Sequence, residues 1–262
     1  MPYDGYTSLS FERSPSGVLT VWLDRPEKGN ATDRAMHGEL ARVWLDIDRD
    51  ETTRAVLLAG RGEAFCAGGD LDLIEAQIGN FELVRQMMDE ARAIVMGALD
   101  CTKPVVAAVH GAAVGAGLAL ALLADISIVA DDAQLAEGHV RLGITAGDHA
   151  VLLWPLLCGM AKAKYHLLTG APLDGREAER IGLVSRSVPA DQVLPEATKV
   201  AEKLATGSET AIRWTRQALN HWYRVGLPAF ESSMAHEMLG FFGPDVQSRL
   251  DSLRTRLKDS AG

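Results

Sequence analysis

One segment constrains the fold of this chain more than any other, because residues 105–124 carry a single polar side chain, His110. Twenty apolar residues are long enough to cross a bilayer as a helix. The segment also contains Gly111, Gly115 and Gly117, with a valine-rich run before them and an alanine- and leucine-rich run after them. Glycines interrupt regular elements, and valine favours strands. We therefore predict a buried strand, a glycine turn and a buried helix here, and no membrane span.

Similar alternations of short apolar runs and helical spacing occur along the whole chain. Runs bounded by turn residues are predicted as strands: residues 9–13, 18–23, 55–59, 105–109, 126–130 and 183–188. Apolar spacing of about 3.6 residues predicts helices: residues 31–48, stretches between 71 and 99, 118–123, 160–168, 175–181 and most of the chain after 193. This recurrence of strands and helices predicts an α/β fold.

The composition excludes several classes of partner. The chain has 262 residues, with 26 lysines and arginines against 35 acidic residues, giving a net charge of -9 and no basic block. Nucleic acid and anionic membranes are therefore not expected as partners. The chain has an odd number of cysteines, which are widely spaced and show no metal-binding pattern: Cys66, Cys101 and Cys158. Its first residues lack the pattern of a signal peptide. We expect a reduced, cytoplasmic protein with no metal site.

Two glycine-rich loops carry the strongest chemical signal. They are Phe65-Cys66-Ala67-Gly68-Gly69-Asp70-Leu71 and His110-Gly111-Ala112-Ala113-Val114-Gly115-Ala116-Gly117, each placed where a strand gives way to a helix. The first N–H groups of a helix have no partner inside the helix, so two such loops that converge can form an oxyanion hole. The alternative is that the glycines only permit tight turns. A dinucleotide site is a weaker alternative, because that motif normally follows the first strand.

These loops, together with residues 167–185 and the segments Leu23-Asp24-Arg25-Pro26 and Asn30-Ala31, resemble the enoyl-CoA hydratase/isomerase (crotonase) superfamily. The resemblance implies a crotonase-like spiral of ββα repeats in residues 1–195 and a C-terminal helical trimerisation region in residues 196–262. It also implies an acyl-CoA substrate, with CoA as part of the substrate and no other cofactor, and a homotrimer or a dimer of trimers.

The C-terminal region carries an apolar stripe that fits either the core or a subunit contact. Ile212, Leu219 and Trp222 form this stripe, with Trp214 and Tyr223 beside it.

The resemblance also assigns residues of the substrate site. The backbone N–H groups of Gly69 and Ala116 are the implied oxyanion donors. Ala116 stands where the family most often has glycine, but its N–H is retained if its φ stays negative. The implied acyl-CoA contacts are Glu27, Lys28, Ala67, Gly68, Asp70, Leu71 and Gly115. Near the C-terminus, the family often uses a phenylalanine and a lysine to contact the CoA of a neighbouring subunit. This chain has Leu253, Arg254 and Arg256 there.

The acid/base pair departs from the family pattern. Hydratases of the family carry two glutamates at positions that hold Ala119 and His139 here. Histidine titrates near neutral pH, so we predict that His139 is the acid/base and that Asp148 orients it. Glu137 is expected to point the other way, as alternate residues do on an extended segment. The alternative is an ordinary polar histidine, with Asp148 capping a helix that begins near His149.

Three functions follow from these residues. The first is an acyl-CoA enzyme of enoyl-CoA hydratase/isomerase type that stabilises a thioester enolate. The second is a C–C bond hydrolase that opens a β-diketone with a His–Asp pair, as in a minority branch that the sequence resembles at His139 and Asp148. The third is a catalytically weak acyl-CoA-binding protein.

Overall fold

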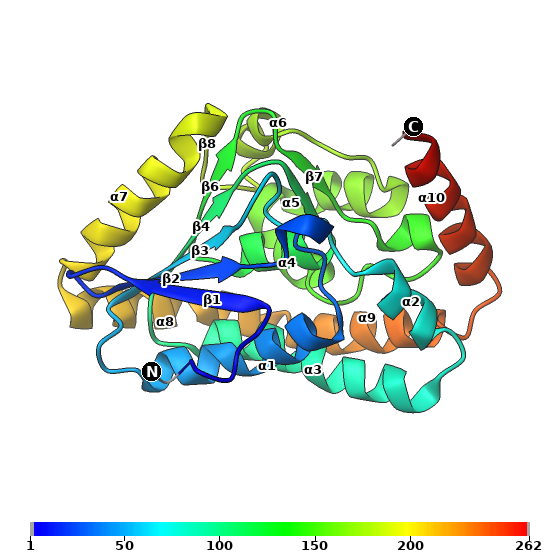
Figure 1. The fold of residues 1–262 in the computed structure, drawn as a ribbon, viewed down its shortest axis with the longest axis horizontal. Helices are drawn as coiled ribbons and strands as arrows, with labels where there is room; N and C mark the ends of the chain where they lie inside the picture. The colour runs from blue at the N-terminus through cyan, green and yellow to red at the C-terminus, as the bar shows by residue number, and fades with distance from the viewer. Residues whose placement is uncertain (1–2, 261–262) are drawn as a thin grey trace.

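The computed structural model describes residues 3–260, so Met1, Pro2, Ala261 and Gly262, at the ends of the two predicted regions, lie outside it. Its main sheet has six strands in the order β1-β2-β3-β4-β6-β8 (Figure 1). Strands β1 and β2 are antiparallel and the other neighbouring pairs are parallel. The strands of this sheet are β1 (Leu9–Arg13), β2 (Val18–Leu23), β3 (Ala55–Gly60), β4 (Val105–Val109), β6 (Ile126–Ala130) and β8 (Arg186–Val188).

A second, smaller sheet pairs β5 (Ala112–Val114) with β7 (Gln134–Ala136). Isolated bridges extend it, since Cys66 pairs with Ala113 and Leu135 pairs with Leu173. In β4–β5–α4 the chain thus gives one strand to the main sheet and a short strand to the second sheet before a helix, and β6 and β7 repeat this order before η2 and α5. This spiral of ββα repeats confirms the predicted fold class. Strands β5 and β7 were not predicted, because three residues are too short to show a period.

Helices surround the sheets. They are α1 (Arg34–Arg49), α2 (Leu71–Gln77), α3 (Phe81–Asp100), α4 (Ala116–Leu123), α5 (Ala150–Thr169), α6 (Gly175–Arg180), α7 (Val193–Ala205), α8 (Glu209–Val225), α9 (Leu227–Gly240) and α10 (Val246–Ser260). The 3-10 helices are η1 (Pro26–Lys28), η2 (His139–Leu142) and η3 (Ala190–Gln192). Helix α7 packs on the main sheet, and α9 packs on α3 and α5 (Figure 1). The predicted boundary at residues 195 and 196 falls inside α7.

The apolar segment of residues 105–124 forms the centre of the molecule. All residues of β4 are buried, and so is every residue of α4 from Gly117 to Leu123. A helix that is apolar on all sides is stable when other elements surround it completely. Within residues 3–260, no helix has both the length and the apolar character needed to cross a membrane.

Helix α5 begins ten residues earlier than predicted, at Ala150 rather than Met160. Pro155 and Gly159 lie within it, and Gly159 has a φ of 77° where two helical pieces meet. Both residue types normally end a helix. Here Leu152, Leu153 and Trp154 are buried, so tertiary packing determines the earlier start.

Helix α8 buries polar side chains and exposes apolar ones, unlike a typical surface helix. Its buried residues are Arg216 and Asn220, whereas Leu219 and Trp222 of the predicted stripe, and Trp214 beside it, are exposed. Ile212 is half-buried, and Tyr223 beside the stripe packs against the core, so Leu219 and Trp222 are the members of the stripe that are not core within one chain. The interpretation as a subunit contact stays a prediction.

Candidate active site

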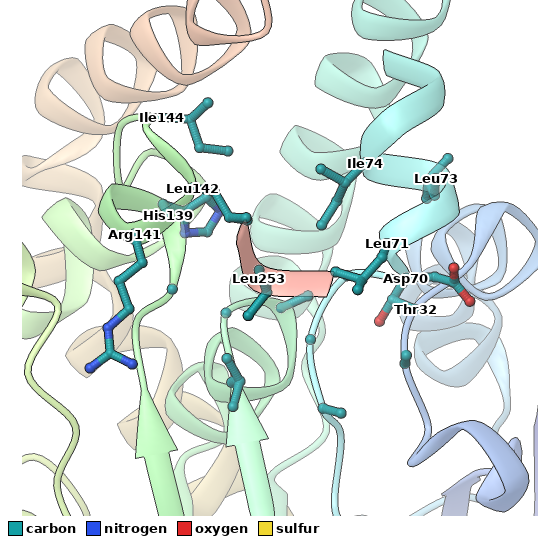
Figure 2. A pocket seen from close by; sticks show the side chains of 18 of the residues that line it. Thr32, Asp70, Leu71, Leu73, Ile74, His139, Arg141, Leu142, Ile144 and Leu253 are labelled. Atoms are coloured by element: carbon teal, nitrogen blue, oxygen red, sulfur yellow. The ribbon is translucent and has the colours of Figure 1, made fainter. Parts of the chain in front are cut away.

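A cavity of about 930 Å³ brings together residues from both halves of the chain. Almost all predicted site residues line it: Lys28, Ala67, Gly68, Gly69, Asp70, Leu71, Gly115, Ala116, His139 and Asp148. Glu27 is the exception, because it is exposed on η1 and does not line the cavity. Figure 2 shows His139, Arg141 and Leu142 on one side of this space and Thr32, Asp70 and Leu71 on the other.

The two glycine loops lie against each other at this cavity. The Cys66 N–H donates to the Ala112 carbonyl at 2.9 Å, and the Val114 N–H donates to the Cys66 carbonyl at 3.0 Å. Close approach requires glycine at two places. A Cβ on Gly68, whose φ is +102°, would lie 3.0 Å from the Val114 oxygen, and a Cβ on Gly117 would lie 2.4 Å from the Cys66 oxygen. The glycines therefore permit close packing, as the alternative interpretation required.

The same packing leaves two N–H groups unpaired. Thr32 forms hydrogen bonds with the residues on either side of Gly69: its N–H donates to the Gly68 carbonyl, and its own carbonyl accepts from the Asp70 N–H. The Gly69 N–H takes no part in these bonds. Ala116 is the first residue of α4 and so has no acceptor within the helix. Among the described residues, Asn30 is the one non-glycine with positive φ, so the φ of Ala116 is negative, as its proposed role requires. Within residues 3–260, neither the Gly69 nor the Ala116 N–H has a hydrogen-bond acceptor.

His139 lies at the centre of an acidic cluster on the opposite wall. Its Nδ1 contacts the Glu137 carboxylate directly, and the Glu137 side chain is almost fully buried. Its Nε2 lies 3.3 Å from Oε1 of Glu237 and 3.8 Å from Oδ2 of Asp148. The Asp148 separation is longer than a hydrogen bond. The group that holds the ring by a direct hydrogen bond is therefore Glu137, rather than Asp148 as predicted.

Glu137 points toward His139 because the extended segment ends before it. Strand β7 stops at Ala136, and Gly138 adopts an αR conformation ahead of η2. The alternation that placed Glu137 on the other face does not continue through this bend. Asp148 does not cap α5, since its Oδ1 lies 2.5 Å from Nδ1 of His149. His149 is fully buried, and its Nε2 has no hydrogen-bond partner in the part of the chain that the structure describes.

The cluster shifts the protonation of its members in different directions. Burial alone would lower the pKa of His139, but the carboxylates of Glu137, Asp148 and Glu237 outweigh it and hold this pKa well above 6.5. Burial would raise the pKa of Asp148, but His149 and His139 hold it below the ordinary range. For Glu237, burial dominates and raises the pKa. At neutral pH the site thus contains an imidazolium, an ionised Asp148 and a carboxyl that protonates more easily than usual.

These groups can transfer protons, and three of them could also hold a metal. Glu137, His139 and Asp148 offer ligand atoms that all lie within 4.8 Å of one another. An imidazole and carboxylates suit a divalent cation such as Zn²⁺. The direct contact of His139 with Glu137 makes the same set an acid/base group without a metal.

Basic side chains surround part of the cavity. Lys28 and Arg141 line it, and neither has an ion-pair partner among residues 3–260. Leu253, Arg254 and Arg256 of α10 line the cavity of their own chain, whereas the resemblance implied a neighbouring subunit. Arg254 is occupied, since it bonds to Glu75 at 2.8 Å and to Asp72 at 2.7 Å.

Sequence reasoning missed one member of the cluster completely. Glu237 lies on α9, far along the chain from His139, and it is buried with Oε2 unpartnered within the described residues. Glu237 follows the apolar residue Met234 by three positions, a helical spacing, so the sequence shows only an ordinary helical glutamate. Only the packing of α9 on α5 brings it to the cavity.

Comparisons with known proteins agree on one family. The family model described as enoyl-CoA hydratase/isomerase matches residues 13–240. A putative enoyl-CoA hydratase of Thermus thermophilus is 36% identical over 204 residues, covering 77% of this chain and 80% of that protein. The 1,2-epoxyphenylacetyl-CoA isomerase of Escherichia coli is 32% identical over 206 residues, covering 78% and 79%. The crystal structure of an enoyl-CoA hydratase/isomerase from Mycobacterium paratuberculosis superposes with a TM-score of 0.91 at 33% identity, covering 95% of this chain and 100% of that one.

Proposed function

Because this chain belongs to the enoyl-CoA hydratase/isomerase family, we propose that it processes an acyl-CoA thioester through an enolate. The thioester oxygen would accept hydrogen bonds from the N–H groups of Gly69 and Ala116. The observation that carries this proposal is that Gly69 and Ala116 line the same cavity as His139 and that, among the described residues, neither of their N–H groups has an acceptor. Fixed donors of this kind stabilise the negative oxygen that develops in the transition state.

The proton transfers would use Nε2 of His139, because Nδ1 is held by Glu137. In a hydration, the imidazolium gives its proton to the α-carbon while Glu237 takes a proton from the attacking water. Glu237 Oε1 lies 3.3 Å from Nε2, so the proton can return to His139 and restore both groups. In an isomerisation, the same pair removes a proton from one carbon and returns it to another. Asp148 would support the cationic ring by charge rather than by a direct hydrogen bond.

The anionic CoA moiety would lie along the basic side of the cavity. Lys28 and Arg141 have no ion-pair partner in the part of the chain described, so both are free to meet phosphate groups. We propose no resident metal and no cofactor beyond CoA itself. We also assign the enzyme to the cytoplasm, which its three free cysteines support.

A second function is favoured by one specific contact. An imidazole held at one nitrogen by a buried carboxylate, with Glu237 beside the other nitrogen, can also serve the attack of water on a carbonyl carbon, with Glu237 taking the proton of the water. In such a C–C hydrolysis, water adds to a ketone, the adjacent C–C bond breaks, and the released enolate carbon takes the proton. Hydration without bond cleavage remains the first proposal, since the family model covers most of the chain.

One experiment separates these functions. The purified protein is incubated with 2-enoyl-CoA, 3-enoyl-CoA and cyclic β-diketone substrates, and the products are identified by mass and by NMR. Added water with an intact carbon skeleton indicates a hydratase, an unchanged mass with a moved double bond indicates an isomerase, and a new carboxylate with an opened ring indicates a hydrolase. Tight acyl-CoA binding with no product from any substrate would indicate the third function, an acyl-CoA-binding protein.

A further inference from the structure

A second histidine lines the same cavity, outside the acid/base cluster. His37 belongs to α1, five residues after Thr32, and Figure 2 places Thr32 on the wall opposite His139. Its side chain is only 12% exposed. A nearly buried polar side chain on the wall of an apolar pocket needs a partner.

Glu90 of α3 fixes the orientation of His37. Nδ1 of His37 lies 2.7 Å from Oε2 of Glu90, and Arg34 holds the same carboxylate with two hydrogen bonds of 2.5 Å and 2.6 Å. Burial would raise the pKa of Glu90, but His37 and Arg34 lower it to about 2. Glu90 is therefore an ionised acceptor at neutral pH, so Nδ1 of His37 carries a hydrogen. The remaining ring nitrogen, Nε2, has no hydrogen-bond partner among the described residues.

The surroundings of His37 are otherwise those of a pocket for an acyl group. Met87 and Ala91, on either side of Glu90 in α3, line the cavity together with Ile74, Met238 and Phe241. Gln77 is another buried polar residue that lines this cavity, and its Nε2 makes only a long hydrogen bond of 3.3 Å to the Leu73 carbonyl. A plain alkyl chain would fill this pocket but leave Nε2 of His37 without a partner, at a cost in affinity.

Resting on the proposed acyl-CoA function, we infer that His37 binds a hydroxyl group on the acyl chain of the substrate, on the wall away from the acid/base cluster. Nε2 accepts a hydrogen bond when the ring is neutral and donates one when the ring is cationic. A hydroxyl can do both, whereas a carbonyl can only accept. The substrate class is therefore a hydroxylated acyl-CoA rather than a simple fatty acyl-CoA, and His37 is a specificity residue.

The test measures binding, so it does not depend on turnover. Hexanoyl-CoA is compared by calorimetry with 4-, 5- and 6-hydroxyhexanoyl-CoA and with the three oxo analogues. At least one hydroxyl position is expected to bind about 10- to 100-fold more tightly than hexanoyl-CoA, the range of a buried polar group that gains its partner. Equal affinities for all seven esters, or a preference for an oxo analogue, would overturn the inference.

Two variants assign the preference to His37. In His37→Asn, the amide nitrogen can still donate to Glu90 while the cavity-facing nitrogen is lost, so the hydroxyl preference should disappear with the fold intact. His37→Leu should also lose it. His221→Leu, at an exposed position of α8, is the matched control and should keep the preference. A preference that survives His37→Asn contradicts the inference. Failure of every CoA ester to bind the wild-type protein would instead refute the proposed function.

Discussion

Both nitrogens of the His139 ring face carboxylates, and this arrangement determines what the residue can do. Glu137 occupies Nδ1, and Nε2 faces Glu237 and Asp148. Three carboxylates around one imidazole favour its cationic form, which can act as an acid before it acts as a base. Nε2 is therefore the atom at which proton transfer occurs in the proposed mechanism.

Substituting His139 by glutamine should lower kcat by about 10² to 10⁴, the usual contribution of a general acid/base. The affinity for acyl-CoA should change little, because the proposed oxyanion donors are backbone groups. Steady-state kinetics on the substrate identified among the tested CoA esters and β-diketones give kcat. Calorimetry with a non-reacting acyl-CoA gives the affinity. Full turnover by His139→Gln would contradict the assignment and leave Glu237 as the better candidate.

The dependence of kcat on pH should follow the two groups of the site whose pKa values are raised, His139 and Glu237. His139 has a pKa well above 6.5, so its acid form persists past neutral pH and activity falls as the pH rises through that value. Glu237 has a raised pKa, so activity also falls as the pH drops and this carboxylate takes up a proton. A bell-shaped profile is expected. Glu237→Gln should lower kcat across the pH range and remove the acidic limb from the activity that is left, and a profile unchanged by this variant would exclude Glu237 as the base.

The sequence indicated part of this cluster and missed the rest for identifiable reasons. His139 could be selected because it stands where the family carries a glutamate and its side chain suits proton transfer, and Asp148 because this carboxylate follows after a short glycine turn. The role of Glu137 depends on a backbone bend after Ala136, which no residue pattern predicts. Glu237 comes from α9 and is visible only after the helices pack.

At the scale of elements, the start of α4 offers a test of the oxyanion donors. Ala116 is the first helical residue, where proline is favoured because its missing N–H would have no acceptor in the helix. Gly115 has a ψ of -113°, outside the α region that a following proline disfavours. Ala116→Pro should therefore keep the fold while removing one donor.

We expect Ala116→Pro to lower kcat by about 10²- to 10³-fold, as loss of one oxyanion donor does elsewhere. Ala116→Gly is the matched control, since it keeps the N–H and should keep activity. Circular dichroism checks that both variants fold. Equal activity of the proline and glycine variants would show that the Ala116 N–H is not a donor.

Buried polar side chains of α8 form hydrogen bonds with the C-terminal end of α3. Arg216 forms a 2.7 Å ion pair with Asp125 and donates to the carbonyls of Ala98 and Cys101, near the C-terminus of α3. Asn220 donates to the Leu99 carbonyl at 3.0 Å. These groups satisfy carbonyls that have no partner within the helix, and the cation suits the negative end of the α3 dipole.

Arg216→Met should therefore lower the free energy of unfolding by about 2 to 4 kcal/mol, because it leaves the buried carbonyls of Ala98 and Cys101 without their donor and removes the ion-pair partner of Asp125. The control is Arg224→Met, which breaks a partly exposed pair with Asp100 and should cost under about 1 kcal/mol. Urea denaturation measures both. Equal losses in the two variants would contradict this role of Arg216.

The elements themselves were predictable where burial gave a regular pattern. Strands β1, β2 and β3, helix α1 and the strand–turn–helix of residues 105–124 follow from apolar spacing and turn residues. The early start of α5 and the inverted face of α8 were not predictable. In both, contacts with distant elements outweigh the local preference of the residues.

At the scale of the whole molecule, one apolar face stands out because a single chain leaves it exposed. Side chains of α5 and α8 gather around a second cavity of about 910 Å³: Leu156, Met160, Leu168, Trp222 and Val225, the last two being 68% and 75% exposed. Monomeric proteins rarely expose contiguous apolar surface of this kind. Together with the inverted face of α8, this surface supports the proposed homotrimer or dimer of trimers.

The proposed assembly predicts that wild-type protein sediments at three or six times the mass of one chain at micromolar concentration. Trp222→Glu should place a charge in the contact and shift the protein to monomers that keep their helical content. Phe81→Glu is the matched control, because Phe81 is equally exposed, at 68%, but lies at the start of α3 and does not line the second cavity. It should leave the mass unchanged. Sedimentation of the wild-type protein as a monomer, or equal masses of the two variants, would show that this face does not form the subunit contact.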